Sequence, residues 1–115
     1  MNNIYIQRTT NSIKELIVGI INNIIQNDKI QHINITDVEL TKDVSFSTIY
    51  YTILENSNEN LLLVSKLLEE NKKKIKAQLA NKLKNIKKIP SLIFKYDKSY
   101  ENGNKIDKIL KKIKK

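Results

Sequence analysis

Lysines are the residues of this 115-residue sequence whose types and spacing indicate chemistry. The segment 72–88, KKKIKAQLANKLKNIKK, holds eight lysines and no acidic residue. Like charges three or four residues apart on a helix repel, so a face that only meets solvent usually interleaves acids. Lysines without acids instead suit contact with phosphate groups. The segment therefore predicts a nucleic-acid-binding surface, with a solvated helix face as the plain alternative.

Other chemically capable residues do not form a catalytic pattern. Asp37 and Asp43 lie beside a turn-like segment, where hydrogen bonds within the turn are the commoner use of a carboxylate. His32, the single histidine, has no identifiable partner and is expected in an exposed loop. Asp97 and Ser99 suit the end of a strand better than a nucleophilic site. We therefore expect no enzymatic activity, no bound metal and no cofactor.

Aromatic residues offer a second way to contact a nucleic acid, because bases stack on their rings. Packing in the core of a small sheet is the commoner use of such side chains, and we expect it here. The residues in question are Phe46, Tyr50, Tyr51, Phe94 and Tyr96.

Length and composition predict one domain covering residues 1–115, with a core from about residue 10 to residue 98. The chain contains no cysteine, which excludes a disulfide framework or a cysteine metal site. No apolar run approaches the roughly 18 residues of a membrane span, and the start MNNIYIQRTT does not resemble a signal peptide. We expect a cytoplasmic monomer without a small-molecule substrate.

The net charge of +9 is unevenly distributed along the chain. Residues 1–70 carry five basic and nine acidic residues, whereas residues 71–115 carry sixteen lysines and three acids. Lysine, isoleucine and asparagine are all abundant, so lysine content alone says little about function. Compositional drift would not separate the two signs, and the separation predicts a basic surface on one side of the molecule.

The first half of the sequence predicts a helix followed by a hairpin. Ser12 to Glu15 fits a capping box, and the apolar residues after it form one helical stripe that ends near Asn27 and Asp28. Two β-branched and aromatic runs, 33–40 and 46–54, flank a turn at 41–45. The apolar positions change parity near Thr36 and Asp37, which predicts a β-bulge.

The second half predicts two helices, a strand and a short tail. Residues 61–70 are apolar on most of a helix circumference and are expected to be well buried. The lysine-rich helix that follows has an apolar stripe from Ile75 to Ile86 and is expected to end at Pro90. A strand at 92–96 and a short basic helix or tail at 103–115 complete an α+β order, α-β-β-α-α-β. Such a chain forms a three-stranded sheet with helices on one face.

Two blocks of this sequence resemble bacterial ribosome-binding factor A. In residues 27–54, NDKIQHINITDVELTKDVSFSTIYYTIL, the segments Thr36-Asp37-Val38, Thr41-Lys42-Asp43-Val44 and Ile49-Tyr50-Tyr51 match the hairpin of that family. Residues 90–106, PSLIFKYDKSYENGNKI, match its Pro-x-Leu-x-Phe-x-x-Asp-x-Ser ending. The blocks occur in the expected order and spacing, so the resemblance covers nearly the whole chain.

This resemblance implies a type II KH-like domain that binds the small (30S) ribosomal subunit during maturation, near the 5′-terminal part of 16S rRNA. Two departures stand out. Asn27-Asp28-Lys29 replaces an Asp-Pro-Arg segment, and Lys72-Lys73-Lys74 occupies the place of an Ala-x-Gly kink between the helices. The kink geometry is left open: Lys74 could adopt a glycine-like conformation, Asn71 could supply the turn, or the helices could bend with little strain.

An ordinary KH domain grips single-stranded RNA with a G-x-x-G loop, and neither Gly19 nor Gly103 lies in such a motif. Binding must then rely on lysine–phosphate contacts and on the shape of a folded rRNA. The candidate RNA-contacting residues are Lys72, Lys73, Lys74, Lys76, Lys84, Lys87, Lys88, Lys29 and Arg8. Two other functions remain open: a generic nucleic-acid-binding module, and an interaction protein that uses its lysines on an acidic protein partner.

Overall fold

The structure, a computed structural model, describes residues 2–83 and 88–98. Its elements follow the predicted order: α1 (Asn2–Ile24), β1 (Ile33–Leu40), β2 (Phe46–Ile53), α2 (Asn58–Glu70), α3 (Lys72–Lys82) and β3 (Ser91–Tyr96). The α+β architecture and the α-β-β-α-α-β order are therefore confirmed. The expected segment at 103–115 lies outside the described residues.

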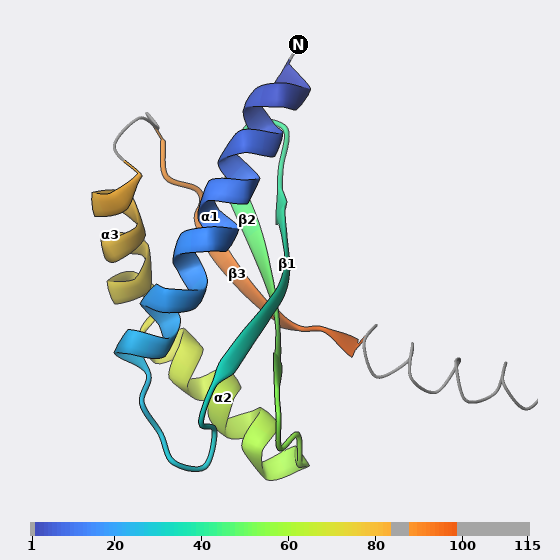
Figure 1. Ribbon diagram of the computed structural model, residues 1–115, viewed down its shortest axis with the longest axis vertical. Helices are drawn as coiled ribbons and strands as arrows, with labels where there is room; N and C mark the ends of the chain where they lie inside the picture. The colour runs from blue at the N-terminus through green and yellow to red at the C-terminus, as the bar shows by residue number, and fades with distance from the viewer. Residues whose placement is uncertain (1, 84–87, 99–115) are drawn as a thin grey trace, which may run out of the picture.

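The three strands form one sheet in the order β1-β2-β3. β1 and β2 are an antiparallel hairpin, and β3 runs parallel to β2 along its other edge. The register of β1 on β2 shifts between Ile35 and Asp37, which confirms the predicted bulge. Figure 1 shows α1 lying across the twisted sheet, with α2 and α3 beside it.

Burial along the strands shows that the helices cover a single face of the sheet. In β2 the residues at odd positions, from Ser47 to Ile53, are buried, whereas their neighbours at even positions are partly or fully exposed. Helix and strand side chains meet in one core. Its fully buried members include Ile13, Ile17, Ile21, Ile33, Ile49, Val64, Leu68, Ile75 and Leu79.

Polar side chains attach the first helix to the sheet. Asn22 of α1 donates from Nδ2 to the Ile33 carbonyl (2.8 Å) and accepts from the Ile33 N–H (2.7 Å). The amide thereby pairs with β1 much as a neighbouring strand would. Ser57 caps α2, because its hydroxyl accepts from the Asn60 N–H at 3.2 Å.

The boundaries of two helices differ from the prediction. α1 starts at Asn2, so the capping box at Ser12 is wrong: that residue lies inside the helix. Thr9 is buried (4% exposed) and extends the apolar stripe toward the N-terminus without an apolar side chain. α3 ends at Lys82, because Leu83 leaves the helical conformation (φ −98°, ψ 66°); Pro90 is not its stop.

Within the described ranges, no helix is long and apolar enough to cross a membrane.

The region around the second helix corrects one expectation and decides the kink geometry that the sequence left open. Only one side of α2 is well buried, and Leu62 on its other side is 74% exposed. The kink lies at Asn71, which ends α2 and begins α3 with φ −104° and ψ 7°. Its N–H and its Nδ2 both donate to the Leu67 carbonyl (3.1 and 2.8 Å). Since this φ is negative, the turn needs no glycine-like conformation at Asn71 or Lys74.

Candidate nucleic-acid interface

The apolar and cationic sides of α3 separate as the sequence predicted. Ile75, Leu79 and Leu83 are buried in the core. Lys73 and Lys74 are exposed, and Lys76 is half-buried. A half-buried lysine can cover apolar surface with its methylenes and still keep its ammonium group in solvent.

A groove of about 390 Å³ lies where the start of α3 meets the edge of the sheet. Its walls come from three elements that are distant in sequence: α3, β3 and the first residue of β2. The lining residues are Phe46, Lys72, Lys73, Lys76, Ser91, Leu92 and Ile93. The sequence predicted a cationic surface on one helix, whereas the structure combines the lysines of α3 with apolar side chains of the sheet in one groove.

The hairpin turn fixes the strand that carries Phe46. The Thr41 N–H donates to the Phe46 carbonyl (3.0 Å), and the Phe46 N–H donates to the Thr41 hydroxyl (3.1 Å). On the neighbouring residue, the Ser45 hydroxyl accepts from Lys88 Nζ at 3.2 Å. Lys88 is therefore drawn to the hairpin and adds its charge next to the groove.

Asp43 closes the same turn through its carboxylate. Hydrogen bonds from the Ser45 hydroxyl, the Ser45 N–H and the Thr41 hydroxyl lower the pKa of Asp43 to about 2. Asp37 likewise accepts from the Val38 N–H (2.8 Å). Both carboxylates serve local hydrogen bonding, as expected, and His32 is exposed.

Two of the candidate lysines are engaged by acids. Lys72 Nζ lies 2.9 Å from Glu69 Oε1 and 5.8 Å from the centre of the Phe94 ring. Lys29 Nζ lies 4.0 Å from Glu59 Oε1 at an exposed site. Lys73, Lys74 and Lys76 have no ion pair within the described part of the chain. These three are consequently the candidate cations of α3 that are available to an external anion.

The candidate set does not form one continuous site. Lys72, Lys73 and Lys76 line the groove, and Lys88 contacts the adjacent hairpin. The remaining members are distributed as follows: Lys74 is exposed on α3, Arg8 is exposed on α1, Lys29 follows α1, and Lys84 and Lys87 lie outside the described residues.

Phe46 is the groove residue whose environment the sequence analysis assigned wrongly. It was expected in the core, but it is 48% exposed, whereas Tyr51 is buried (4% exposed). The same expectation is wrong for Tyr50, which is only partly buried and shares the parity of Phe46. The alternation could have revealed this: Ile49, Tyr51 and Ile53 define the buried parity, and counting back makes Ser47 buried and Phe46 exposed. Hydrophobicity alone suggested the reverse.

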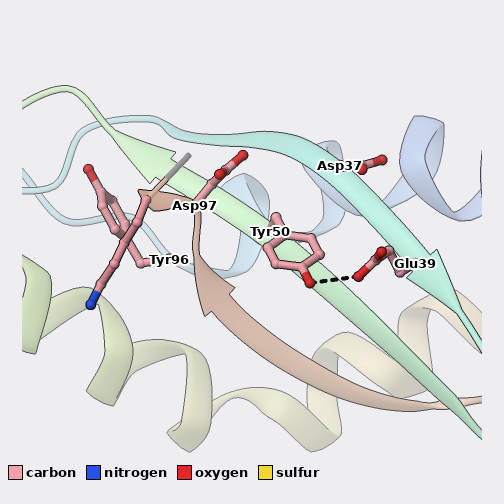
Figure 2. A pocket seen from close by; sticks show the side chains of 6 residues that line it. Asp37, Glu39, Tyr50, Tyr96 and Asp97 are labelled. Carbon is pink, nitrogen blue, oxygen red and sulfur yellow. Dashed lines mark hydrogen bonds between the residues drawn. The ribbon is translucent and has the colours of Figure 1, made fainter. Parts of the chain in front are cut away.

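A second cavity lies on the sheet face that the helices leave open, and it is acidic (Figure 2). It measures about 410 Å³ and is lined by Asp37, Glu39, Tyr50, Tyr96, Asp97 and Lys98. The Tyr50 hydroxyl donates to Glu39 Oε1 at 2.6 Å, and this bond raises the pKa of Tyr50. The Thr36 hydroxyl donates to Asp97 Oδ2 and ties the bulge of β1 to the end of β3.

Neither cavity provides a metal site. Across residues 2–83 and 88–98, no three histidine, cysteine or acidic side chains are grouped closely enough to hold a metal ion. The groove at the start of α3 instead offers cations and an exposed aromatic ring, which suit binding of an anion that carries flat, apolar groups.

Comparison with known proteins gives a consistent result across the chain. Residues 6–110 match the family model for ribosome-binding factor A. Ribosome-binding factor A of Phytoplasma mali is 49% identical over 109 residues, which cover 95% of this chain and 96% of that protein. The protein of the same description from Staphylococcus epidermidis is 36% identical over 115 residues, covering 100% and 97%.

Solved structures show the same fold. The crystal structure of ribosome-binding factor A from Thermus thermophilus has a TM-score of 0.66 and 18% identity, covering 79% of this chain and 93% of that one. A Thermus thermophilus homology model fitted into a cryo-EM map of a complex between the 30S subunit and ribosome-binding factor A also scores 0.66. It covers 78% of this chain and 92% of that one, at 18% identity.

Proposed function

The chain belongs to the ribosome-binding factor A family, and we propose that it binds the free or immature small ribosomal subunit. Bound there, it assists maturation of 16S rRNA near the 5′-terminal helix without catalysing a covalent step. The observation that carries the proposal is the match to the Phytoplasma mali relative over 95% of this chain. The complex of the Thermus thermophilus relative with the 30S subunit supports the choice of partner.

The unpaired lysines of α3 supply a physical basis for this binding. Lys73, Lys74 and Lys76 form no ion pair within the described residues. Each can therefore neutralise a phosphate and release its counterions without first losing an acidic partner. Phosphate contacts fix position and orientation but carry no sequence information. Selectivity for the subunit must then come from the shape of a folded rRNA site.

Co-sedimentation tests the proposal directly. The purified protein is centrifuged with free small subunits, free large subunits and assembled ribosomes at the same ribosomal-particle concentration. We expect recovery in the pellet with free small subunits and little with the other two. Equal recovery with all three particles and with duplex DNA would instead indicate a generic nucleic-acid-binding module.

A second control addresses an acidic protein partner. Small subunits are treated with ribonuclease before the protein is added, and the proteins they retain are presented at the same concentration. We expect binding to fall with RNA digestion, because the lysines contact phosphates. Binding that survives digestion contradicts rRNA recognition.

A further inference from the structure

Phe46 is placed where a ring is available to a ligand. It is the first residue of β2 and is opposite in parity to buried Ser47 and Ile49. Its side chain stays 48% exposed although Leu92 and Ile93 lie in the same groove. Aromatic rings dominate binding energetics when a partner covers them, so an exposed ring in a groove is informative.

The backbone that carries the ring is held in a defined position. The two hydrogen bonds between Thr41 and Phe46 fix the backbone at 3.0 and 3.1 Å. The parallel register pairs Phe46 with Ser91, so β3 supports the backbone of Phe46 on the side opposite Thr41. Because this backbone is already ordered, only the side-chain torsions of Phe46 remain to be fixed when a ligand stacks on its ring, which lowers the entropic cost of binding.

The cationic wall lies within the same groove. Lys73 and Lys76 line it and have no ion pair among the described residues, whereas Lys72 is neutralised by Glu69. Lys88 reaches Ser45 beside Phe46. A flat apolar platform next to unpaired ammonium groups matches a molecule that joins a flat apolar ring system to an anionic group.

We propose that this groove binds one unpaired nucleotide of an RNA strand, with its base stacked on Phe46 and its phosphate held by Lys73 and Lys76. The inference rests on the proposed function and names the part of the RNA that the protein engages. It assigns recognition of a single-stranded element to a chain without a G-x-x-G loop. An acidic peptide would satisfy the lysines but would leave the ring without a flat partner.

Substitutions at Phe46 test the stacking interaction, and the chain contains no tryptophan. F46W introduces a single indole at the platform. F46A removes the ring, and F46L keeps apolar bulk without a π face. L62A removes an apolar side chain that is 74% exposed on α2 and serves as the matched control. Both sites of change are exposed, so folding is expected and is checked by circular dichroism.

Binding is measured by anisotropy with a labelled eight-nucleotide single-stranded RNA and with the duplex of the same sequence. We expect F46A and F46L to weaken single-strand binding by roughly five- to 150-fold, the range that loss of one stacked base produces. F46W should retain affinity, and the single strand should quench its fluorescence. L62A should stay within about twofold of the unmodified protein.

Several results would overturn the groove proposal. F46A or F46L binding the single strand as tightly as L62A would exclude stacking. Absence of quenching in F46W, or equal loss of duplex binding in F46A, would do the same. A Phe46-dependent interaction with polyglutamate would assign the groove to an acidic peptide.

The two proposals fail separately. If the unmodified protein sediments with small subunits but F46A does not differ from L62A on single strands, the groove proposal fails and the function stands. If the unmodified protein ignores small subunits, the proposed function fails. A Phe46-dependent single-strand interaction in that case would still establish the nucleotide site.

Discussion

The lysine side of α3 and the open face of the sheet carry opposite charges and use them differently. On the open face, Glu39 accepts from Tyr50, and Asp97 accepts from Thr36. On α3, Lys73 and Lys76 have no acidic partner in the described ranges. The carboxylates are engaged in hydrogen bonds with other side chains of the sheet, whereas the lysines remain available to another molecule.

This difference shows that charge density alone does not identify a binding surface. Buried or bonded charges contribute to folding, because each hydrogen bond to a charged group stabilises the native state. Exposed charges without partners contribute little to folding and much to association. The lysine groove and the acidic cavity have similar volumes, about 390 and 410 Å³, so size does not distinguish them. What distinguishes a binding role from a structural role is whether the charged side chains already have partners.

The largest expected effect comes from reversing the unpaired lysines. Changing Lys73, Lys76 and Lys88 together to glutamate should weaken small-subunit binding by at least about 3 kcal/mol, or more than a hundredfold in Kd. Thermal stability should change little, because Lys73 and Lys88 are exposed and glutamate at position 76 keeps two methylene groups of the half-buried lysine. Filter binding and a thermal melt measure both quantities.

The matched control reverses three exposed lysines elsewhere: Lys14, Lys66 and Lys95. It changes the net charge equally, so a general electrostatic effect would weaken both triple variants alike. Equal weakening would break the comparison between the two regions.

The open face should show the reverse pattern. Asp97→Ala removes the acceptor of the Thr36 hydroxyl and should lower the free energy of unfolding by about 1.5–3 kcal/mol. Subunit binding should remain unchanged under conditions where the variant is folded. Urea denaturation and filter binding test this, with Asp28→Ala, an exposed carboxylate, as the control. A loss of binding in folded Asp97→Ala would place the open face in the interface.

A comparison within α3 sharpens the role of pairing. The unmodified protein should show a log–log salt slope of roughly −4 to −6 between 50 and 200 mM salt, for about five to seven phosphate contacts. Lys73→Ala should reduce the magnitude of this slope by about 0.9. Lys72→Ala should reduce it less, because Glu69 already neutralises Lys72 at 2.9 Å. Equal changes would mean that the ion pair opens on binding.

Sequence patterns predicted the elements whose signal is local. The bulge at Thr36 and Asp37 followed from a parity change, and the helix predicted at 61–70 followed from its run of apolar residues. The start of α1 was missed because the apolar residues of its first turns, Ile4 and Tyr5, are exposed, while the polar residue Thr9 takes a buried position in the stripe. The end of α3 was missed because no glycine or proline marks Leu83.

The candidate site was only partly predictable for a different reason. The lysines were visible in one stretch of sequence, but the groove needs β3 and Phe46 to meet the start of α3. Long-range packing of this kind leaves no local signal. The pairing of Lys72 with Glu69 was within reach, since the residues are three positions apart on neighbouring helical turns.

A smaller effect on stability is expected at Ser47 of β2. Its hydroxyl is fully buried and has no hydrogen-bond partner among the described residues. Burying such a group without a partner costs free energy, so Ser47→Ala should stabilise the protein by up to about 1 kcal/mol and leave subunit binding unchanged. Urea denaturation measures the change. Destabilisation would show that the hydroxyl has a partner in solution.

The smallest expected effect concerns the hairpin that positions Phe46. Hydrogen bonds from Ser45 and Thr41 hold the pKa of Asp43 at about 2, below its ordinary value of 3.8. A depressed carboxylate pKa means that the ionised form stabilises the fold above about pH 4, and that this contribution is lost as the pH falls toward 2. The turn also holds Val44 at φ 60°, a strained conformation for a β-branched residue, which makes these hydrogen bonds more necessary.

Asp43→Asn keeps a side-chain oxygen but cannot titrate. The difference in melting temperature between the unmodified protein and Asp43→Asn should therefore be constant above about pH 4.5 and shrink toward pH 2. A carbon-13 NMR titration of the Asp43 carboxyl should give a midpoint near 2. A midpoint near 3.8 would show that the turn is open in solution, and Phe46 would then lack the fixed backbone on which its stacking role depends.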